Sequence, residues 1–259
     1  MPALDTLLRR DRVIGGAALL ATALVAWLYL FDLSAAMSGM DMAGMPGMAM
    51  TRDHAWGVVD VVLLFVMWVV MMIAMMVPAA APMILTFATV QRRRRERDGA
   101  AVPTAAFLLG YAVVWTAYSA VAALVQWRLH EADLLSATMA SRSAQLGGVV
   151  LIVAGVFQWT PLKQACLAKC RSPLSFVMTE WREGRVGAFV MGLRHGAYCV
   201  ACCWALMALL FVAGVMNLLW VAGLAVFVLA ERVLPGGVAV GRIAGALLLV
   251  AGIVALVRG

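Results

Sequence analysis

The chain has 259 residues, of which 65% are hydrophobic and 13% charged, with a formal net charge of +7. A soluble globular domain is typically about half apolar and about a quarter charged. The mean hydropathy of +0.97 therefore excludes an ordinary soluble domain and indicates a protein that crosses a membrane several times. The basic residues lie in short segments between apolar runs, which argues against nucleic-acid binding and favours a role in membrane orientation.

Seven apolar segments are each long enough to span about 30 Å of hydrocarbon at about 1.5 Å per residue. They lack the alternation of a strand, so we expect an all-α, polytopic membrane helix bundle of about seven transmembrane helices. The spans are placed at approximately 13–33, 57–77, 104–126, 146–165, 187–212, 216–234 and 238–257. The sequence VAGVMN between the fifth and sixth spans predicts a tight helical hairpin.

The first apolar run follows three arginines and precedes LSAAM, which loosely resembles a signal-peptide cleavage site. Its length of about 19 residues exceeds the roughly 7–15 of a signal-peptide core. A retained first helix is therefore favoured over a cleaved one.

Basic residues are distributed unevenly between the two sides of this topology. With the N-terminus in the cytoplasm, fifteen Lys and Arg residues face inward and four face outward, which is the bias of cytoplasmic loops. We expect a single membrane domain, 1–259, in a bacterial cytoplasmic (inner) membrane, with the C-terminus extracytoplasmic. Its expected loops are an extracytoplasmic Met-rich loop at 34–56 and basic cytoplasmic loops at 91–103 and 166–186.

The fifth span contains HGAYCVACCW, which begins at residue 195. On a helix, its histidine and three cysteines fall within an arc of about 100°. Thiolate and imidazole suit Zn²⁺, Cu(I) and other soft ions, and the small Gly192 and Gly196 would let a neighbouring helix supply more donors. Buried cysteine can also act as a small hydrophobe, but the clustering favours metal or redox function for His195, Cys199, Cys202 and Cys203.

Methionines are the second group of soft donors. Five lie on the second span, where thioethers suit Cu(I) but also fill cores: Met67, Met71, Met72, Met75 and Met76. The Gly-rich loop MSGMDMAGMPGMAM is not expected to form a stable helix and resembles the Met-rich segments of copper importers. Its expected metal-capture residues are Met37, Met40, Met42, Met45, Met48, Met50 and His54; the alternative is a low-complexity linker.

Other ionisable and thiol residues lie near the span ends. Cys166 and Cys170 share a helical face close to Lys163, Lys169 and Arg171, which would favour thiolates for ligation or redox chemistry. Asp60 is either a gating or accessory group or a simple helix end. Glu231 is expected to pair locally with its neighbour Arg232, and a gating or ligand role is the alternative.

Three motifs in series resemble a bacterial family of predicted metal-binding integral membrane proteins of unknown function. They are MWVVMMIAMMVPAAAPMI, TPLKQACLAKCRSPLSF and the segment from HGAYCVACCW to ERVLP, within roughly 57–235. The resemblance implies metal positions at the second-span methionines and at all five cysteines. Ala201 departs from the glycine often found before the Cys-Cys pair.

These features lead to one main hypothesis: a non-enzymatic membrane protein that binds copper as Cu(I), with zinc possible, and transports or delivers it. The expected partners are membrane lipid, the metal ion and a metallochaperone or periplasmic metal-binding protein, without nucleic acid. The alternatives are a membrane thiol-disulfide oxidoreductase, and a structural or assembly factor in which the metal only staples helices. No nucleotide-binding segment supports an ATP-driven pump.

Overall fold

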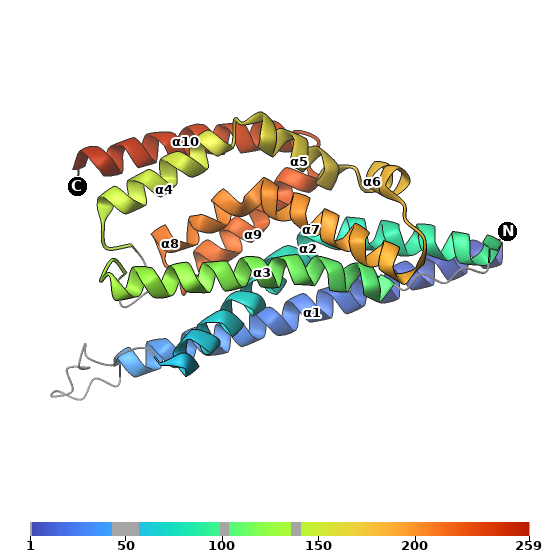
Figure 1. Cartoon of the computed structure of the whole chain (residues 1–259), viewed down its shortest axis with the longest axis horizontal. Helices are drawn as coiled ribbons and strands as arrows, with labels where there is room; N and C mark the ends of the chain where they lie inside the picture. Colours follow the sequence, from blue (N-terminus) through green and yellow to red (C-terminus); the bar gives the residue numbers. More distant parts are fainter. Residues whose placement is uncertain (1, 43–56, 99–103, 136–140, 259) are drawn as a thin grey trace.

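The computed structural model describes residues 2–42, 57–98, 104–135 and 141–258, and these ranges form helices without a β-strand. Figure 1 shows an elongated bundle with the two termini at opposite ends of its long axis. The all-α prediction is confirmed. The helices are α1 (Pro2–Met42), α2 (Val58–Asp98), α3 (Thr104–Glu131), α4 (Ala144–Phe157), α5 (Pro161–Arg171), α6 (Pro173–Glu180), α7 (Gly184–Ala208), α8 (Leu210–Ala213), α9 (Leu218–Val233) and α10 (Gly237–Arg258).

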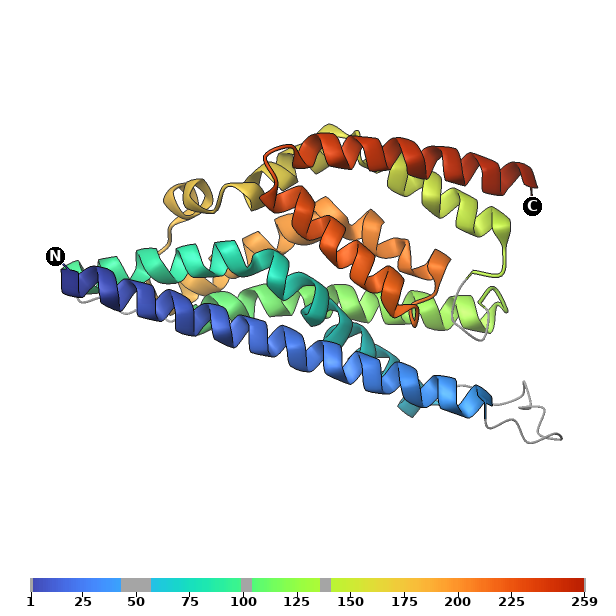
Figure 2. The ribbon, with the colours of Figure 1, turned by 180° about the vertical axis from the view of Figure 1, so that it is seen from behind.

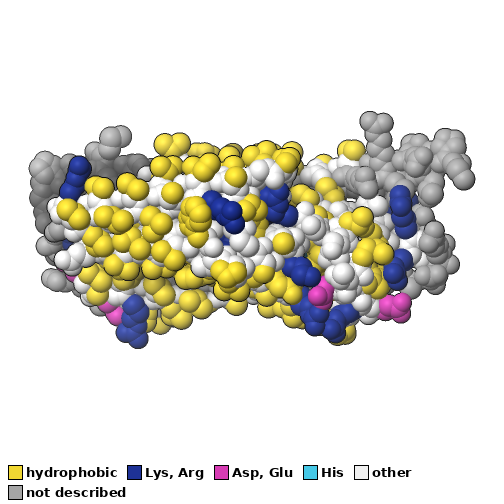
Figure 3. Space-filling view, turned by 90° about the horizontal axis from the view of Figure 1, so that it is seen from above, with side chains coloured by type: hydrophobic (Ala, Val, Ile, Leu, Met, Phe, Trp, Pro, Cys, Tyr) yellow, Lys and Arg dark blue, Asp and Glu magenta, His cyan; other side chains and the backbone are white. Residues whose placement is uncertain are grey.

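Several of these helices are long and apolar enough to cross a membrane. Among the described residues there are five, and a sixth if the bent pair α4–α5 is one span: 13–36, 58–94, 104–131, 184–213 and 237–258. Helix α9 covers the expected sixth span with only 16 residues. Hydrophobic side chains cover most of the left half of the face in Figure 3, as a lipid-facing surface requires.

The first two helices are longer than expected. Helix α1 continues through Met42, although the Gly-rich segment from residue 34 onward was expected to be a loop. Adding a turn to an existing helix needs no new nucleus, and Ala and Met are good helix formers. Helix α2 likewise continues through its arginine run to Asp98, so most of the segment expected to be a basic loop at 91–103 is helical.

The expected fourth span is broken instead of continuous. Helices α4 and α5 meet at an angle of 65°, because Thr160 caps α5 by accepting a hydrogen bond from the Lys163 amide, 3.3 Å away, and Pro161 occupies the first turn. Proline suits that position because its missing N–H has no partner there. The expected loop at 166–186 is also mostly helical, since α5 and α6 fill it.

The connection from α8 to α9 is the predicted hairpin. Gly214 has a φ of 91°, a conformation that favours glycine, and the side chain of Asn217 accepts a hydrogen bond from the Trp220 amide at 3.2 Å. The chain therefore reverses within four residues and returns α9 along the bundle (Figure 2).

Close helix packing fixes the position of α7. It lies along α3 (Figure 1), and a side chain at Gly192 would collide with the backbone carbonyl of Phe107. The predicted close approach at this face of α7 is confirmed. Opposite it, the methionines of α2 and Trp68 form a buried core.

Candidate metal centre

The three cysteines of α7 point into the protein. Cys199, Cys202 and Cys203 have exposed fractions of 0%, 2% and 1%. Their spacing puts them on one helical face, as predicted, and α3, α4 and α5 pack around α7. The thiols of Cys202 and Cys203 donate to the carbonyl oxygen of Cys199, at 3.2 and 2.9 Å, so each satisfies its weak donor within the helix.

The sulfurs converge on the guanidinium group of Arg232, which α9 brings in from the other side. Its Nη2 atom lies 3.0 Å from Cys199 Sγ, 3.5 Å from Cys202 Sγ and 4.0 Å from Cys203 Sγ. Arg232 itself is buried. One nitrogen thus contacts all three sulfurs, and the convergence expected from the helical wheel is present around a cation.

Helix α5 contributes a fourth sulfur to this cluster. Cys170 is buried where α5 packs against α7, close enough to Cys202 for the two side chains to influence each other, and Cys166, one turn earlier, is also buried. The break before α5 makes this possible, because it redirects the helix across α7. We call Cys170, Cys199, Cys202 and Cys203 the thiol cluster; all five cysteines are free.

Tyr111 connects the thiol cluster to the methionine helix. Its hydroxyl lies 3.2 Å from Cys199 Sγ and donates to the carbonyl oxygen of Met76 at 3.3 Å. The five predicted methionines of α2 are all buried, with at most 4% exposed. The structure therefore places the methionine helix next to the cluster through Tyr111, and it packs its thioethers in the same core.

His195 does not join the thiols directly. Its ring lies between aromatic side chains, with centroids 6.0 Å from Phe107, 5.6 Å from Tyr111 and 5.5 Å from Phe176. Both ring nitrogens are buried and have no hydrogen-bond partner among the described residues. His195 is one turn from Cys199, so it lies beside the cluster but its nitrogens contact none of its sulfurs.

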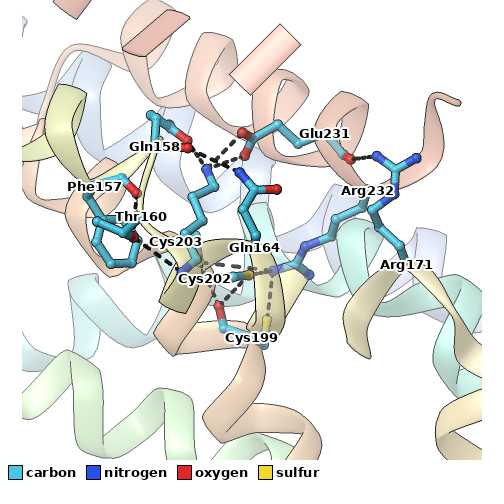
Figure 4. A network of polar contacts seen from close by, with 11 residues as sticks. Phe157, Gln158, Thr160, Gln164, Arg171, Cys199, Cys202, Cys203, Glu231 and Arg232 are labelled. Atoms are coloured by element: carbon cyan, nitrogen blue, oxygen red, sulfur yellow. Dashed lines mark hydrogen bonds and ion pairs between the residues drawn. The ribbon is translucent and has the colours of Figure 1, made fainter. Parts of the chain in front are cut away.

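A second polar group lies against the cluster, as Figure 4 shows. The Nζ atom of Lys163 lies 2.7 and 2.9 Å from the two carboxylate oxygens of Glu231 and also donates to Gln158 Oε1. Lys163 and Glu231 are 1% and 2% exposed. The expected local pair of Glu231 with Arg232 is wrong: neighbouring residues on a helix point about 100° apart, so Glu231 meets α5 while Arg232 meets α7.

The basic residues of α5 also have other partners than expected. Lys163 pairs with Glu231, and Arg171 donates to the backbone carbonyls of Glu231, Leu234 and Pro235. The arginine anchors the α9–α10 turn. The cation that contacts the thiols is Arg232, which comes from a different helix.

Of the remaining predicted residues, only Asp60 has a described side chain, and it has a local role. Asp60 accepts a hydrogen bond from the Gly57 amide at 2.9 Å and so closes the start of α2. Met37, Met40 and Met42 belong to the end of α1, where the structure describes the backbone only. Met45, Met48, Met50 and His54 lie outside the described residues. The Met-rich capture loop thus stays a prediction.

Sequence reasoning missed Arg232 as a partner of the thiols, Tyr111 as their neighbour, and Gln158 and Glu231 as the partners of Lys163. A signal was present for one of them: Arg232 follows an acidic residue inside an apolar segment, and an ionisable group at that depth needs a partner. The way α5 meets α7 and α9 depends on the break between α4 and α5. No local sequence pattern predicts which helices meet there.

The thiol cluster has the chemistry of a soft-ion site but is not arranged as a finished one. Among the described residues, no group of three or more His, Cys, Asp or Glu side chains has the geometry to hold a metal ion, because the sulfurs face Arg232 instead of a shared centre. The donors still fit Cu(I), which thiolates select. Binding an ion between two of these sulfurs requires a smaller movement of the side chains than forming a site with four ligands.

Fold and site together define an all-helical protein with an apolar surface and a buried cluster of thiols. The family model described as PpoB2, copper chaperone, matches residues 65–255, which is most of the chain. The protein therefore belongs to this copper chaperone family, which confirms the expected relation to metals and suggests a copper-related function. No curated protein and no solved structure matches the chain.

Proposed function

We propose that the protein is an integral membrane copper chaperone that binds Cu(I) at the thiol cluster and delivers it to an acceptor. The observation that carries this proposal is the convergence of Cys199, Cys202 and Cys203 on the Nη2 atom of Arg232, beside Cys170 from another helix. Buried sulfurs from two helices offer soft donors to an ion and keep water away from it. Membership of a copper chaperone family supports copper over zinc.

The route to the cluster follows from the elements around it. Thioethers bind Cu(I) without losing a proton, so the buried methionines of α2 offer weaker stations that lead toward the thiols through the Tyr111 contact. A conducting or delivering path needs several sites, none too tight to leave. In the proposed orientation, with the N-terminus cytoplasmic and α9 completing seven passes of the bacterial inner membrane, the Met-rich segment collects the ion outside.

The proposed delivery partner is a soluble metal-binding protein, either a cytoplasmic metallochaperone or its periplasmic counterpart. The arginine run at the end of α2 supports a cytoplasmic docking site or a contact with anionic lipid. Handover of Cu(I) then requires no catalysis by the chain, because exchange of the ion's ligands for those of a tighter-binding acceptor supplies the driving force.

The test is Cu(I) binding by the purified full chain in detergent, titrated against a chromogenic Cu(I) chelator under anaerobic conditions. The double variant Cys199→Ser/Cys202→Ser should lose the stoichiometric, tightly bound Cu(I). Cys166→Ser should retain it, because Cys166 lies outside the thiol cluster and has no described contact with Arg232. Unchanged binding in the double variant would exclude the thiol cluster as the copper site.

A second candidate function rests on the proximity of Cys170, on α5, to Cys202, on the α7 helix against which α5 packs. A disulfide between them would form with loss of two electrons and two protons to an external acceptor, as in a thiol oxidoreductase. Thiol trapping of cells grown without added copper separates the two functions: a Cys170–Cys202 disulfide that turns over favours redox chemistry, and fully reduced cysteines favour the copper chaperone.

A further inference from the structure

Arg232 is a buried cation whose side chain, within the described residues, hydrogen-bonds only to sulfur atoms. Its Nη2 atom contacts three cysteines, while its Nε and Nη1 atoms are buried without a partner in the described structure. An arginine taken out of water is costly unless an opposite charge compensates it. The acidic groups Glu231 and Glu180 are already paired, with Lys163 and Arg194 respectively, so neither carboxylate compensates Arg232, and its guanidinium faces the sulfurs of the thiol cluster instead.

We propose that Arg232 determines the metal selectivity of the thiol cluster by restricting it to a monovalent, low-coordinate ion and excluding tetrahedral divalent ions. This inference rests on the proposed copper-binding function and names the residue that sets its specificity.

The charge balance favours a monovalent ion. Cu(I) bound by two thiolates carries one net negative charge, and the guanidinium of Arg232 neutralises it. Zn²⁺ bound by two thiolates is neutral, and the same guanidinium would then leave one uncompensated positive charge in the protein interior, which is strongly unfavourable. Arg232 therefore favours Cu(I) without being a ligand.

The geometry acts in the same direction. Zinc in structural sites needs four ligands, whereas the sulfurs of Cys199, Cys202 and Cys203 already surround the Nη2 atom of Arg232. An ion held by Cys199, Cys202 and Cys203 together would take the space that Nη2 fills. An ion between Cys170 and Cys202 leaves the guanidinium on Cys199, so two-coordinate binding is compatible with Arg232 and tetrahedral binding is not.

The experiment compares the full-length wild type with Arg232→Gln in detergent, using Co²⁺ as a spectroscopic probe for a tetrahedral thiolate site and Zn²⁺ and Cu(I) titrations for affinity. The wild type should bind Cu(I) and show no tetrahedral thiolate–Co²⁺ absorption. Arg232→Gln should gain that absorption, and the ratio of its Zn²⁺ to Cu(I) affinities should rise by about a hundredfold, the scale of uncoupling one buried charge.

Arg194→Gln is the matched control, because Arg194 lies on α7 but pairs with Glu180 outside the cluster; it should behave as wild type. The proposal is overturned if Arg232→Gln binds Cu(I) with an unchanged metal preference, or if the wild type itself forms a tetrahedral thiolate–Co²⁺ site. The second outcome is measured on the wild type, so the proposal can be overturned even if Arg232→Gln misfolds. A wild type that binds no Cu(I) at its cysteines would instead defeat the proposed function.

Discussion

The Nζ atom of Lys163 lies 2.7 Å from one carboxylate oxygen of Glu231 and 2.9 Å from the other, and this buried ion pair joins α5 to α9. The two helices carry Cys170, a member of the thiol cluster, and Arg232, which contacts its other three sulfurs. The pair therefore helps to fix the position of Cys170 relative to Arg232, although neither Lys163 nor Glu231 contacts a sulfur in the described structure.

Removing one partner of this pair should destabilise the protein strongly. Glu231→Gln leaves the Lys163 ammonium buried without a counter-charge, which costs about 3–5 kcal/mol, whereas Lys163→Met with Glu231→Gln leaves no charge and should recover much of the loss. Thermal unfolding in detergent measures both. Glu180→Gln, which breaks a pair with the half-exposed Arg194, should cost about 1 kcal/mol or less; equal losses at the two sites would contradict the role of burial.

The tight contact between α3 and α7 should tolerate no side chain at its centre. A Cβ at Gly192 would collide with the Phe107 carbonyl, so Gly192→Ala forces the helices apart and should lower the unfolding temperature. Separation also moves Tyr111 away from Cys199, so Cu(I) affinity should fall as well.

Gly223→Ala is the control for that substitution. Nothing lies within 4 Å of a Cβ at Gly223, and alanine in a helix interior is more stable than glycine by about 0.5–1 kcal/mol. This variant should keep or raise the unfolding temperature. A similar decrease at both glycines would show that helix packing at Gly192 is not the cause.

The cap that starts α5 should control the position of Cys170. Thr160 accepts from the Lys163 amide at 3.3 Å and donates to the Phe157 carbonyl at 2.8 Å, so Thr160→Ala removes both hydrogen bonds at the break and should cost about 0.5–2 kcal/mol. We expect a looser α5 and faster alkylation of Cys170 in the metal-free protein, measured by mass spectrometry. Thr160→Ser retains the hydroxyl and should keep the wild-type rate.

The sequence predicted the parts of the centre that one helix determines. The cysteines of α7 share a face because a 3.6-residue period places them there, and Gly192 on the adjoining surface admits α3. The hairpin after α8 was equally local, since glycine and a capping asparagine lie at the turn. In each case the residues that decide the geometry are neighbours along the chain.

The contacts between helices were not predictable in the same way. Glu231 and Arg232 are adjacent, so a local pair was the simplest expectation, but helical geometry directs them to α5 and α7. The α4–α5 break depends on a Thr-Pro pair inside an apolar run, and without it Lys163 and Cys170 would not turn toward α9 and α7. Charge partners across helices follow from packing, which hydropathy does not encode.

Substitution of His195 distinguishes a structural role in the core from a functional role in copper binding. Its two ring nitrogens are buried without partners among Phe107, Tyr111 and Phe176, and an unsatisfied buried polar group costs about 1–3 kcal/mol. His195→Phe should therefore raise the unfolding temperature of the metal-free protein, because phenylalanine suits the aromatic surroundings. If the imidazole serves as an accessory copper donor, the same variant should weaken Cu(I) binding in the chelator titration, which is the stability cost of a functional group. A variant that gains stability and keeps full Cu(I) affinity would make His195 a core residue and confine the metal site to sulfur.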